Sequence, residues 1–446
     1  MKATIAAIVL ALLAEGAVVG ERVDAAPQAP APRTNGRSFT LHQVVNNNFQ
    51  GHDGPTSFLR AHFKYAQKLP DYLSKLVEIN PNFRIKFGAA SQGKCYPEVT
   101  LWQVLSLLLT SIIAGEQVGT VEANPSPLVD TEYAVEIGIG TPPQRIRLNL
   151  DTGSSDFWVF STDTTPSMVH DQGLYNANKS TTSHFLTGES WKIKYGDNAS
   201  ASGYVYTDRV QIGETYVDTQ AVQVAVNVTE DLSEDKFVSG ILGMANSAAN
   251  TVRPTPQRTY IDNIKNDLAL PLFTANLQRQ APGSYNFGYI DDFEYTGDIS
   301  YTPIERTFPL WMVHTTGYRI GKTSHDKSIN AIVDTGTSLL LLPETVVSNY
   351  YAKVKGSSVD PRLGMRVVPC NANLPDFYLT IGSYRGRVPG SYMNYGRVSG
   401  NSCFGGIQSS DALPFSVLGD VFLKTQFVVF DYGNARVGFA RKNLYE

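Results

Sequence analysis

The chain has 446 residues, which is ample for a large core, and its 42% hydrophobic and 17% charged residues are typical of a soluble globular protein. Its net charge of −4 at pH 7 excludes the broadly basic surface that binds nucleic acid. The charge is uneven, because residues 27–118 hold nine Lys and Arg against five Asp and Glu, whereas residues 119–446 hold 26 against 33. We expect the basic segment to be held electrostatically to the acidic body, and acid to weaken that contact.

The chain opens with an apolar run typical of a secretory signal peptide. The run extends from Ile5 to Leu13, follows the basic Lys2 and leads into small residues up to Gly20. We therefore expect a signal peptide at residues 1–20, and a short buried helix is the alternative.

Residues 21–118 differ in pattern from the rest of the chain. Between Ser38 and Glu78 the apolar spacing predicts two short basic amphipathic helices, with a membrane-surface helix as the competing interpretation. Residues 99–115 form an uncharged apolar stretch. Three interpretations of this stretch remain open: a buried helix, a marginal membrane anchor, or residues added by a gene-model error.

From Tyr133 onward the pattern changes to short strands and turns. Residues 134–140 and 145–150 are predicted strands around a Pro-containing turn, and the second alternates apolar and polar side chains. Similar strands recur to the end of the chain, where residues 427–430 and 437–440 flank another turn. The body is therefore predicted to be dominated by β-structure.

A repeated motif organises this β-rich body. The sequence Asp-Thr-Gly-Ser-Ser begins at Asp151, and Asp-Thr-Gly-Thr-Ser begins at Asp334, each after an apolar strand. Further along, each copy is followed by an apolar-Leu-Gly turn that ends at Gly243 or Gly419. The repeat predicts two related halves of the body, each with one Asp in a tight polar turn.

We expect an N-terminal lobe at residues 119–305 and a C-terminal lobe at residues 306–446. If Asp151 and Asp334 meet between the lobes, their carboxylates share one proton over a wide acidic range, because the first charge opposes the second. Such a pair can take a proton from a water molecule with one member and donate a proton to a carbonyl oxygen with the other. This chemistry requires no metal ion or cofactor, and we expect neither.

The residues beside each Asp are expected to support the pair. Glycine lets the backbone turn sharply and brings amide N–H groups toward the carboxylates. Hydroxyl side chains can tie the two turns together and donate hydrogen bonds to the outer carboxylate oxygens. The supporting residues are Thr152, Gly153, Ser154, Thr335, Gly336 and Thr337.

These motifs resemble those of the pepsin-like aspartic endopeptidases, in particular secreted fungal enzymes related to penicillopepsin and aspergillopepsin. The resemblance covers about residues 125–446. The motifs that carry it are Ile139–Gln144, Asp151–Phe160, Ile193–Asp197, Ser239–Met244, Asp334–Leu339 and Val417–Asp420. The resemblance implies an all-β-dominated, bilobal fold with a deep cleft between two pseudo-symmetric lobes, preceded by a partly helical prosegment.

The resemblance also implies roles for individual residues. Asp151 and Asp334 would be the catalytic pair. Tyr195 and Gly196 would belong to a β-hairpin flap that closes over the substrate, and Trp158 would donate a hydrogen bond to the flap tyrosine.

In the same family a pocket receives the side chain before the scissile bond. Ile241 would line this pocket, and Asp197 is similar to an acid that lets some fungal relatives accept Lys there. Asn198 departs from the glycine common in the family, although Asn tolerates the positive φ that a hairpin tip requires. Asn198 also begins a glycosylation sequon, which we expect to be unmodified because a glycan would obstruct substrate. Asn178 and Asn227 are the better candidates for glycosylation.

By the same resemblance, residues 21–118 would form an inhibitory prosegment with a lysine paired to the catalytic aspartates. Lys64 is our candidate, since it precedes a tyrosine as in the family. Three other lysines compete for the role: Lys68, Lys86 and Lys94. Acid should protonate carboxylates of the body, loosen the prosegment and permit self-cleavage between residues 119 and 130.

The chain has only three cysteines. Cys370 and Cys403 both lie in the C-terminal third, which favours a disulfide between them, and three free buried thiols are the alternative. Cys95 would then be left over in the segment expected to be removed.

Together these observations predict a secreted acid endopeptidase that acts on polypeptides and is made as a self-activating zymogen. The alternative is a catalytically silent protein of the same fold that binds or inhibits a partner. A glycoside hydrolase also uses two carboxylates, but it gives no reason for matching Asp-Thr-Gly turns. We expect a monomer with its own prosegment as intramolecular inhibitor, and no nucleic acid partner or stable membrane association. We expect secretion, with vacuolar delivery as the alternative, because no apolar tail follows Arg441.

Overall fold

The computed structural model describes residues 117–126, 132–194, 200–361 and 364–444, together with four residues of the preceding segment, Phe58, Ala61, Lys64 and Tyr65. All of these residues belong to one compact unit that spans Gly36–Glu446. The expected signal peptide at residues 1–20, the apolar stretch at residues 99–115 and Cys95 lie outside the described residues.

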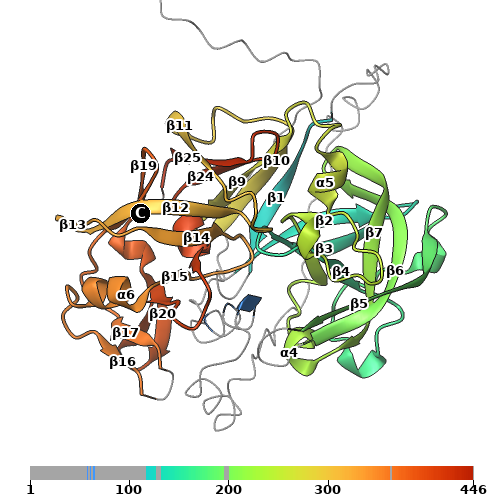
Figure 1. Cartoon of the computed structure of the whole chain (residues 1–446). Helices are drawn as coiled ribbons and strands as arrows, with labels where there is room; N and C mark the ends of the chain where they lie inside the picture. Colours follow the sequence, from blue (N-terminus) through green and yellow to red (C-terminus); the bar gives the residue numbers. More distant parts are fainter. Residues whose placement is uncertain are drawn as a thin grey trace, which may run out of the picture. The chain divides into compact units, whose positions relative to one another are not determined.

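Strands dominate the described residues, which confirms the predicted β-rich body (Figure 1). The first ten strands are β1 (Gly119–Pro125), β2 (Tyr133–Ile139), β3 (Gln144–Asp151), β4 (Phe157–Phe160), β5 (His184–Lys194), β6 (Ser200–Ile212), β7 (Thr215–Val228), β8 (Gly240–Gly243), β9 (Leu272–Gln278) and β10 (Ala281–Phe287). The next eight are β11 (Thr296–Pro303), β12 (Met312–Ile320), β13 (Thr323–His325), β14 (Ile329–Val333), β15 (Leu340–Leu342), β16 (Ser358–Val359), β17 (Arg366–Pro369) and β18 (Phe377–Ile381). The last seven are β19 (Tyr384–Val388), β20 (Asn394–Ser399), β21 (Ser402–Gly405), β22 (Ile407–Ser409), β23 (Ser416–Leu418), β24 (Phe427–Asp431) and β25 (Arg436–Arg441).

The helices in the described part of the chain are short, and none is long and apolar enough to span a membrane. The α-helices are α4 (Glu230–Ser233), α5 (Tyr260–Ile264), α6 (Glu344–Tyr351) and α7 (Asp420–Leu423). Single 3₁₀ turns occur at η3 (Pro166–Met168), η4 (Ala177–Lys179), η5 (Ser247–Ala249) and η6 (Gly390–Tyr392).

The repeat seen in the sequence is also present in the strand pairing. In the first half, β3 runs parallel to β8, while β4 pairs antiparallel with β8 and parallel with β7. In the second half, β14 runs parallel to β23, while β15 pairs antiparallel with β23 and parallel with β22. Each half therefore builds the same local arrangement around its Asp-Thr-Gly turn, as a bilobal fold requires.

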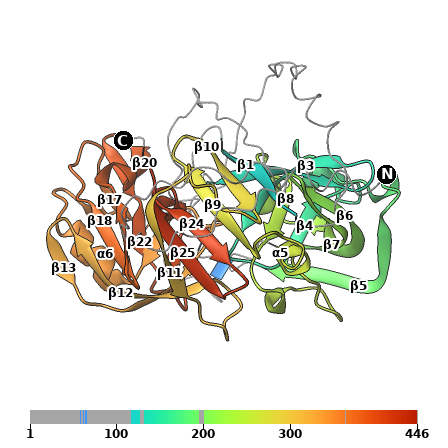
Figure 2. The same cartoon turned by 90° about the horizontal axis from the view of Figure 1, so that it is seen from above.

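The two halves are joined by a shared sheet. A 13-stranded sheet has the order β11-β25-β24-β9-β10-β1-β2-β3-β8-β4-β7-β6-β5. The C-terminal strands β24 and β25 thus lie beside β9 and β11, between the green and orange halves of the molecule (Figure 2). An eight-stranded sheet and a four-stranded sheet complete the second half.

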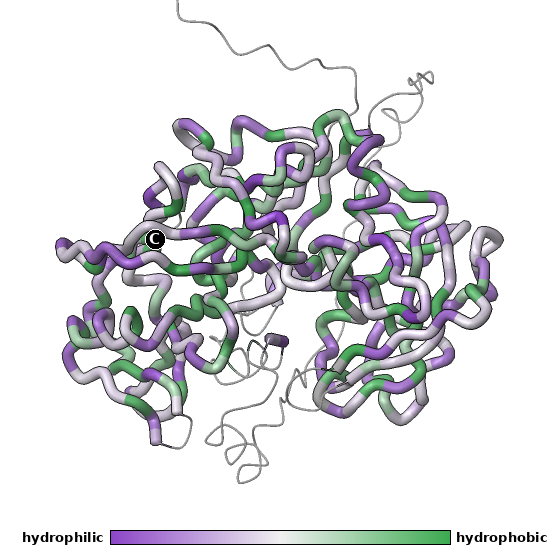
Figure 3. The backbone as a smooth tube through the Cα atoms, in the orientation of Figure 1, coloured by the Kyte–Doolittle hydropathy of each residue, from purple (hydrophilic) through white to green (hydrophobic). Residues whose placement is uncertain are grey.

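The strands that carry the two aspartates change from half-buried to fully buried along their length. In β3, Arg145 and Arg147 are exposed while Ile146 and Leu148 are buried, but every residue from Leu148 to Asp151 is buried. Green and purple segments alternate over short distances along the backbone of the described residues (Figure 3). Burial on both faces fixes the register of the strand end, so the position of the Asp151 side chain is fixed by the core.

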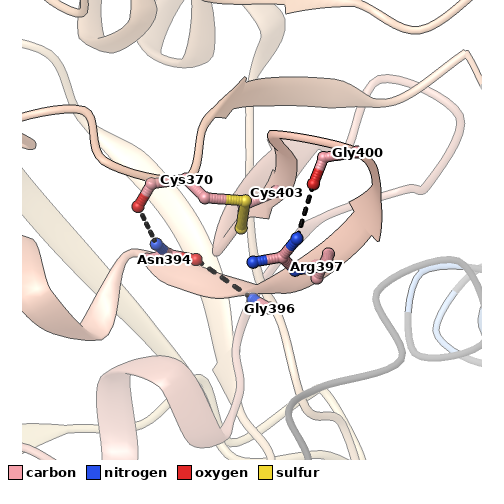
Figure 4. Close-up of a disulfide and its surroundings, with 6 residues drawn as sticks. All are labelled: Cys370, Asn394, Gly396, Arg397, Gly400 and Cys403. Atoms are coloured by element: carbon pink, nitrogen blue, oxygen red, sulfur yellow. Dashed lines mark hydrogen bonds between the residues drawn. A yellow bond between two sulfur atoms is a disulfide. The ribbon is translucent and has the colours of Figure 1, made fainter.

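A disulfide joins Cys370, just after β17, to Cys403 on β21 (Figure 4). This is the pairing favoured by the sequence. Asn394 Nδ2 donates a hydrogen bond to the carbonyl oxygen of Cys370 at 3.0 Å, which ties this side of the bridge to β20. Arg397 donates one to the carbonyl oxygen of Gly400 at 2.7 Å, within the hairpin of β20 and β21 that carries Cys403.

Candidate active site

Asp151 and Asp334 occupy equivalent positions in the two halves. Asp151 is the last residue of β3, and Asp334 directly follows β14. Their exposed fractions are 1% and 0%. Two carboxylates at such positions lose most of their hydration, so their charge state depends on the groups that contact them.

Each carboxylate receives the same set of hydrogen bonds from its own turn. Gly153 N donates to Asp151 Oδ1 at 2.8 Å, and Gly336 N donates to Asp334 Oδ1 at 2.9 Å. The hydroxyls of Ser154 and Thr337 donate to the respective Oδ2 atoms. These donors fix the orientation of both carboxylates and stabilise their charged forms.

Two threonines connect the turns across the boundary between the halves. Thr152 Oγ1 donates to the carbonyl oxygen of Val333 at 2.9 Å, and Thr335 Oγ1 donates to that of Leu150 at 2.6 Å. The amides also cross over, because Thr335 N donates to Thr152 Oγ1 at 3.0 Å and Thr152 N donates to Thr335 Oγ1 at 3.1 Å. This buried, fully paired network holds the two aspartates at a fixed separation.

The two glycines allow a close approach of each turn to the opposite aspartate. A Cβ atom at Gly153 would overlap Asp334 Oδ1, and one at Gly336 would overlap Asp151 Oδ1. Any larger residue at either position would therefore push the carboxylates apart.

A lysine from the preceding segment lies between the two carboxylates. Lys64 Nζ donates to Asp151 Oδ1 at 2.5 Å and to Asp334 Oδ1 at 2.8 Å. The hydroxyl of Tyr65 donates to Asp334 Oδ2, and its ring packs edge-on against Phe415 with 5.3 Å between centroids. The structure thus brings Lys64 to both aspartates, whereas the competing candidates Lys68, Lys86 and Lys94 lie outside the described residues.

Helical spacing explains how this segment reaches the site. The described residues Phe58, Ala61, Lys64 and Tyr65 are helical, and the spacing of three and four puts them along one side of a helix. Phe58 and Ala61 are each 1% exposed and belong to the same apolar core as the body. Apolar packing therefore positions the ammonium group.

The electrostatic effects of this arrangement differ between the two aspartates. Burial raises the pKa of Asp151, and the charge on Asp334 adds to this, although Lys64 opposes both. Burial also acts to raise the pKa of Asp334, but the charge and hydrogen bonds of Lys64, together with the hydroxyls of Thr337 and Tyr65, lower it overall. The two aspartates outweigh burial at Lys64 and raise its pKa. Lys64 therefore stabilises the ionised forms of both aspartates while it is bound.

Comparison with known proteins adds an independent observation. A family model described as eukaryotic aspartyl protease matches residues 132–442. The chain belongs to this family. It is 40% identical to endothiapepsin of Cryphonectria parasitica, over 98% of both chains, and 45% identical to penicillopepsin-2 of Penicillium janthinellum, over 73% of this chain and 81% of the relative.

A solved structure in the same family is also similar. The aspartic proteinase from Irpex lacteus is 25% identical and superposes with a TM-score of 0.61, covering 74% of this chain and 98% of the other. Together these relatives identify the chain as an aspartic-type endopeptidase with a pepsin-like fold, as the sequence predicted.

The other site residues predicted from the family pattern are placed only in part. Tyr195, Gly196 and Asp197 lie outside the described residues, between β5 and β6. Trp158 is 3% exposed, and its buried Nε1 has no hydrogen-bond partner among the described residues. Ile241 is half-buried and lies opposite Trp158 where β8 pairs with β4.

One supporting residue of this aspartyl protease was not predicted from the sequence. Asp156 is 2% exposed and accepts hydrogen bonds from Gln223 Nε2, from both Thr251 N and Thr251 Oγ1, and from Asn250 Nδ2, at 2.9–3.2 Å. Burial raises its pKa despite these donors. Through these hydrogen bonds Asp156 holds the start of the strand that follows the Asp151 turn. The only sequence signal for this role was the position of Asp156 within the motif Asp151–Phe160.

Proposed function

We propose that the chain is a secreted acid endopeptidase, made as a zymogen, in which Asp151 and Asp334 activate water and Lys64 blocks them. The observation that supports this most directly is the contact of one ammonium group with both carboxylates. An ammonium there occupies the position that a water molecule would need in order to contact both carboxylates.

After Lys64 leaves, the pair holds one shared proton. Water between the carboxylates then loses a proton to the ionised member while its oxygen bonds to the carbonyl carbon of the peptide. The protonated member donates its proton to the carbonyl oxygen, which gives a neutral tetrahedral diol. Collapse of the diol transfers a proton to the amide nitrogen, breaks the C–N bond and regenerates the singly protonated pair.

The lowered pKa of Asp334 supports activation by acid, whereas the raised pKa of Asp151 does not add to this effect. The pKa of Asp334 is lower with the prosegment bound, so bound Lys64 stabilises the ionised form. That stabilisation is present above the ordinary carboxyl pKa and is lost as pH falls through the lowered pKa of Asp334. The raised pKa of Lys64 keeps the ammonium charged throughout this range.

The flap role of Tyr195 is part of the same proposal. A buried indole N–H without a partner is costly, so Trp158 requires an acceptor. We expect the hydroxyl of Tyr195 to accept this hydrogen bond when the hairpin formed by β5 and β6 closes over a substrate.

Secretion is supported by two features of the chain. The predicted signal peptide directs it to the secretory route, where the Cys370–Cys403 disulfide is stable. Vacuolar delivery along the same route is the alternative outcome.

The test is peptide cleavage at acid pH by variants of the acid-treated chain. Asp334→Asn and Asp151→Asn should each reduce kcat/KM on an internally quenched peptide by at least about a thousandfold, and a statine-type peptide inhibitor should block the unmodified protein. Asp218→Asn is the matched control, since Asp218 is exposed and pairs only with Arg209 among the contacts observed. Unchanged cleavage by Asp334→Asn would refute the two-aspartate mechanism, and no inhibitor-sensitive cleavage by the unmodified protein would favour the silent binding protein.

A further inference from the structure

Three aromatic side chains form an exposed group on the outer face of the hairpin made by β5 and β6. Phe185 is 49% exposed and Tyr204 is 47% exposed, and Tyr206 is half-buried beside them. The ring of Phe185 contacts both tyrosines edge-on, with centroids 6.0 Å from Tyr204 and 5.2 Å from Tyr206. We call these three residues the aromatic group.

A cluster of this kind is unusual on a solvated surface. Single exposed apolar side chains are ordinary, but a contiguous exposed aromatic surface indicates a binding partner. The faces of the rings are apolar and electron-rich, so they bind surfaces of weakly polarised C–H bonds such as those of a sugar ring.

The strand register connects the aromatic group to a glycosylation sequon. Asn227 on β7 lies opposite Ser202 on β6, and Ser202 lies opposite Lys192 on β5. Paired residues of antiparallel strands share a face, so Asn227 projects from the face that Ser202 occupies. Asn227 is exposed and begins the sequon completed by Thr229.

Tyr204 lies on that same face. Side chains two apart on a strand share a face, which places Ser202, Tyr204 and Tyr206 together, whereas Ala201 and Val205 are buried on the other side. The register between β6 and β7 shifts between Ser202 and Gly203, so Tyr204 pairs with Val224. Tyr204 still lies only two residues, about 7 Å, along β6 from the partner of Asn227, within reach of a sugar attached to Asn227. Phe185 on β5 lies opposite Tyr206 and extends the surface onto the next strand.

We propose that Asn227 carries an N-linked glycan whose first sugars lie across Tyr204 and Phe185. The glycan covers the aromatic group that the chain itself leaves exposed. This inference rests on the secretory route in the proposed function, because N-glycans are attached there.

The location gives the glycan a structural effect. The aromatic group lies at the base of the hairpin whose tip is the predicted flap at residues 195–199. Asn227 lies opposite Ser202, two residues from the last described pair of the hairpin, Lys194 and Ser200. A glycan that runs from Asn227 to Tyr204 and Phe185 extends away from that end and toward the base of the hairpin. Glycosylation at Asn227 is therefore compatible with cleavage, unlike a glycan at Asn198.

The experiment uses the full chain secreted from a filamentous fungus. Peptide mapping by mass spectrometry measures occupancy at Asn227, and nitration by tetranitromethane measures the accessibility of individual tyrosines. Asn227→Gln should remove one glycan mass and increase the rate of Tyr204 nitration several-fold. Tyr216 is the internal control, since it is 37% exposed but lies at the other end of β7 and should react at an unchanged rate.

Asn178→Gln is the matched control, because Asn178 is an exposed sequon residue on η4. It should leave Tyr204 nitration unchanged. An unmodified Asn227 in the secreted protein, equal Tyr204 nitration with and without the glycan, or protection that depends on Asn178 would each overturn the proposal. Cleavage of a quenched peptide at acid pH by the same samples reports on the proposed function separately, because neither substitution touches the aspartates.

Discussion

Replacing Lys64 with Met is the most informative perturbation of this molecule. The change keeps a flexible apolar stem of similar length and removes the ammonium group that contacts both aspartates. The side chain is 11% exposed in the folded protein, so solvent does little to screen the interaction that is lost. We expect the prosegment to be released at higher pH and the chain to process itself faster.

The size of the effect follows from the contacts. Removing one partner of a buried ion pair costs about 3–5 kcal/mol, and the lower end applies here because the two carboxylates can share a proton once Lys64 is gone. A loss of about 3 kcal/mol weakens the binding of the prosegment to the body roughly a hundredfold. Since one pKa unit corresponds to about 1.4 kcal/mol, the pH of half-maximal processing should rise by up to about two units.

The assay is incubation of the purified full-length chain across a pH series, with processing followed by intact mass and activity by a quenched peptide. Lys68→Met, Lys86→Met and Lys94→Met are the matched controls, since each removes one charge from the same segment. If Lys64→Met processes with the pH dependence of the unmodified chain, or if one control shifts as far, the role of Lys64 in blocking the aspartates is wrong.

Three further predictions follow from contacts in the structure. Tyr65→Phe keeps the ring packed on Phe415 and removes the hydroxyl that donates to Asp334. It should raise the pH of half-maximal processing by less than one unit in the same assay, because only one hydrogen bond is lost. A larger rise than that of Lys64→Met would contradict this ordering. Thr335→Val leaves buried backbone groups unpaired, so it should lower the free energy of unfolding by about 1–3 kcal/mol. It should also lower kcat. An unchanged denaturant midpoint together with an unchanged kcat would contradict the role of the threonine hydrogen bonds that connect the two turns. Cys403→Ser removes a disulfide with a sequence separation of 33. In the chain-entropy model this should lower the free energy of unfolding by about 4 kcal/mol. A Tm within about 1 °C of that of the unmodified protein would refute this prediction.

The sequence predicted the local structure around the aspartates well. The strands expected at residues 134–140 and 145–150 are β2 (Tyr133–Ile139) and β3 (Gln144–Asp151) in the structure. This agreement arises because alternation along a strand depends only on which neighbours face the core. The roles of Asp151 and Asp334 as catalytic residues stay predictions.

Features that depend on distant pairing could not be predicted in this way. The tyrosine after Lys64 favoured this lysine only by resemblance, because its contact with both aspartates depends on how Phe58 and Ala61 pack against the body. The ligands of Asp156 lie 67–95 residues further along the chain, so no window of sequence contains them. The shared sheet could not be predicted for the same reason, because strand partners across the two halves are selected by the completed core.

The position of β24 and β25 in the shared sheet has a consequence for synthesis. The chain leaves the ribosome N-terminus first, and β9 lacks its β24 neighbour until residues 427–431 have emerged. Pairings between residues far apart in sequence also form slowly, because a long loop must close first. The sheet that joins the two halves is therefore completed only near the end of translation, and a nascent chain cannot assemble the finished body before its last strands are made.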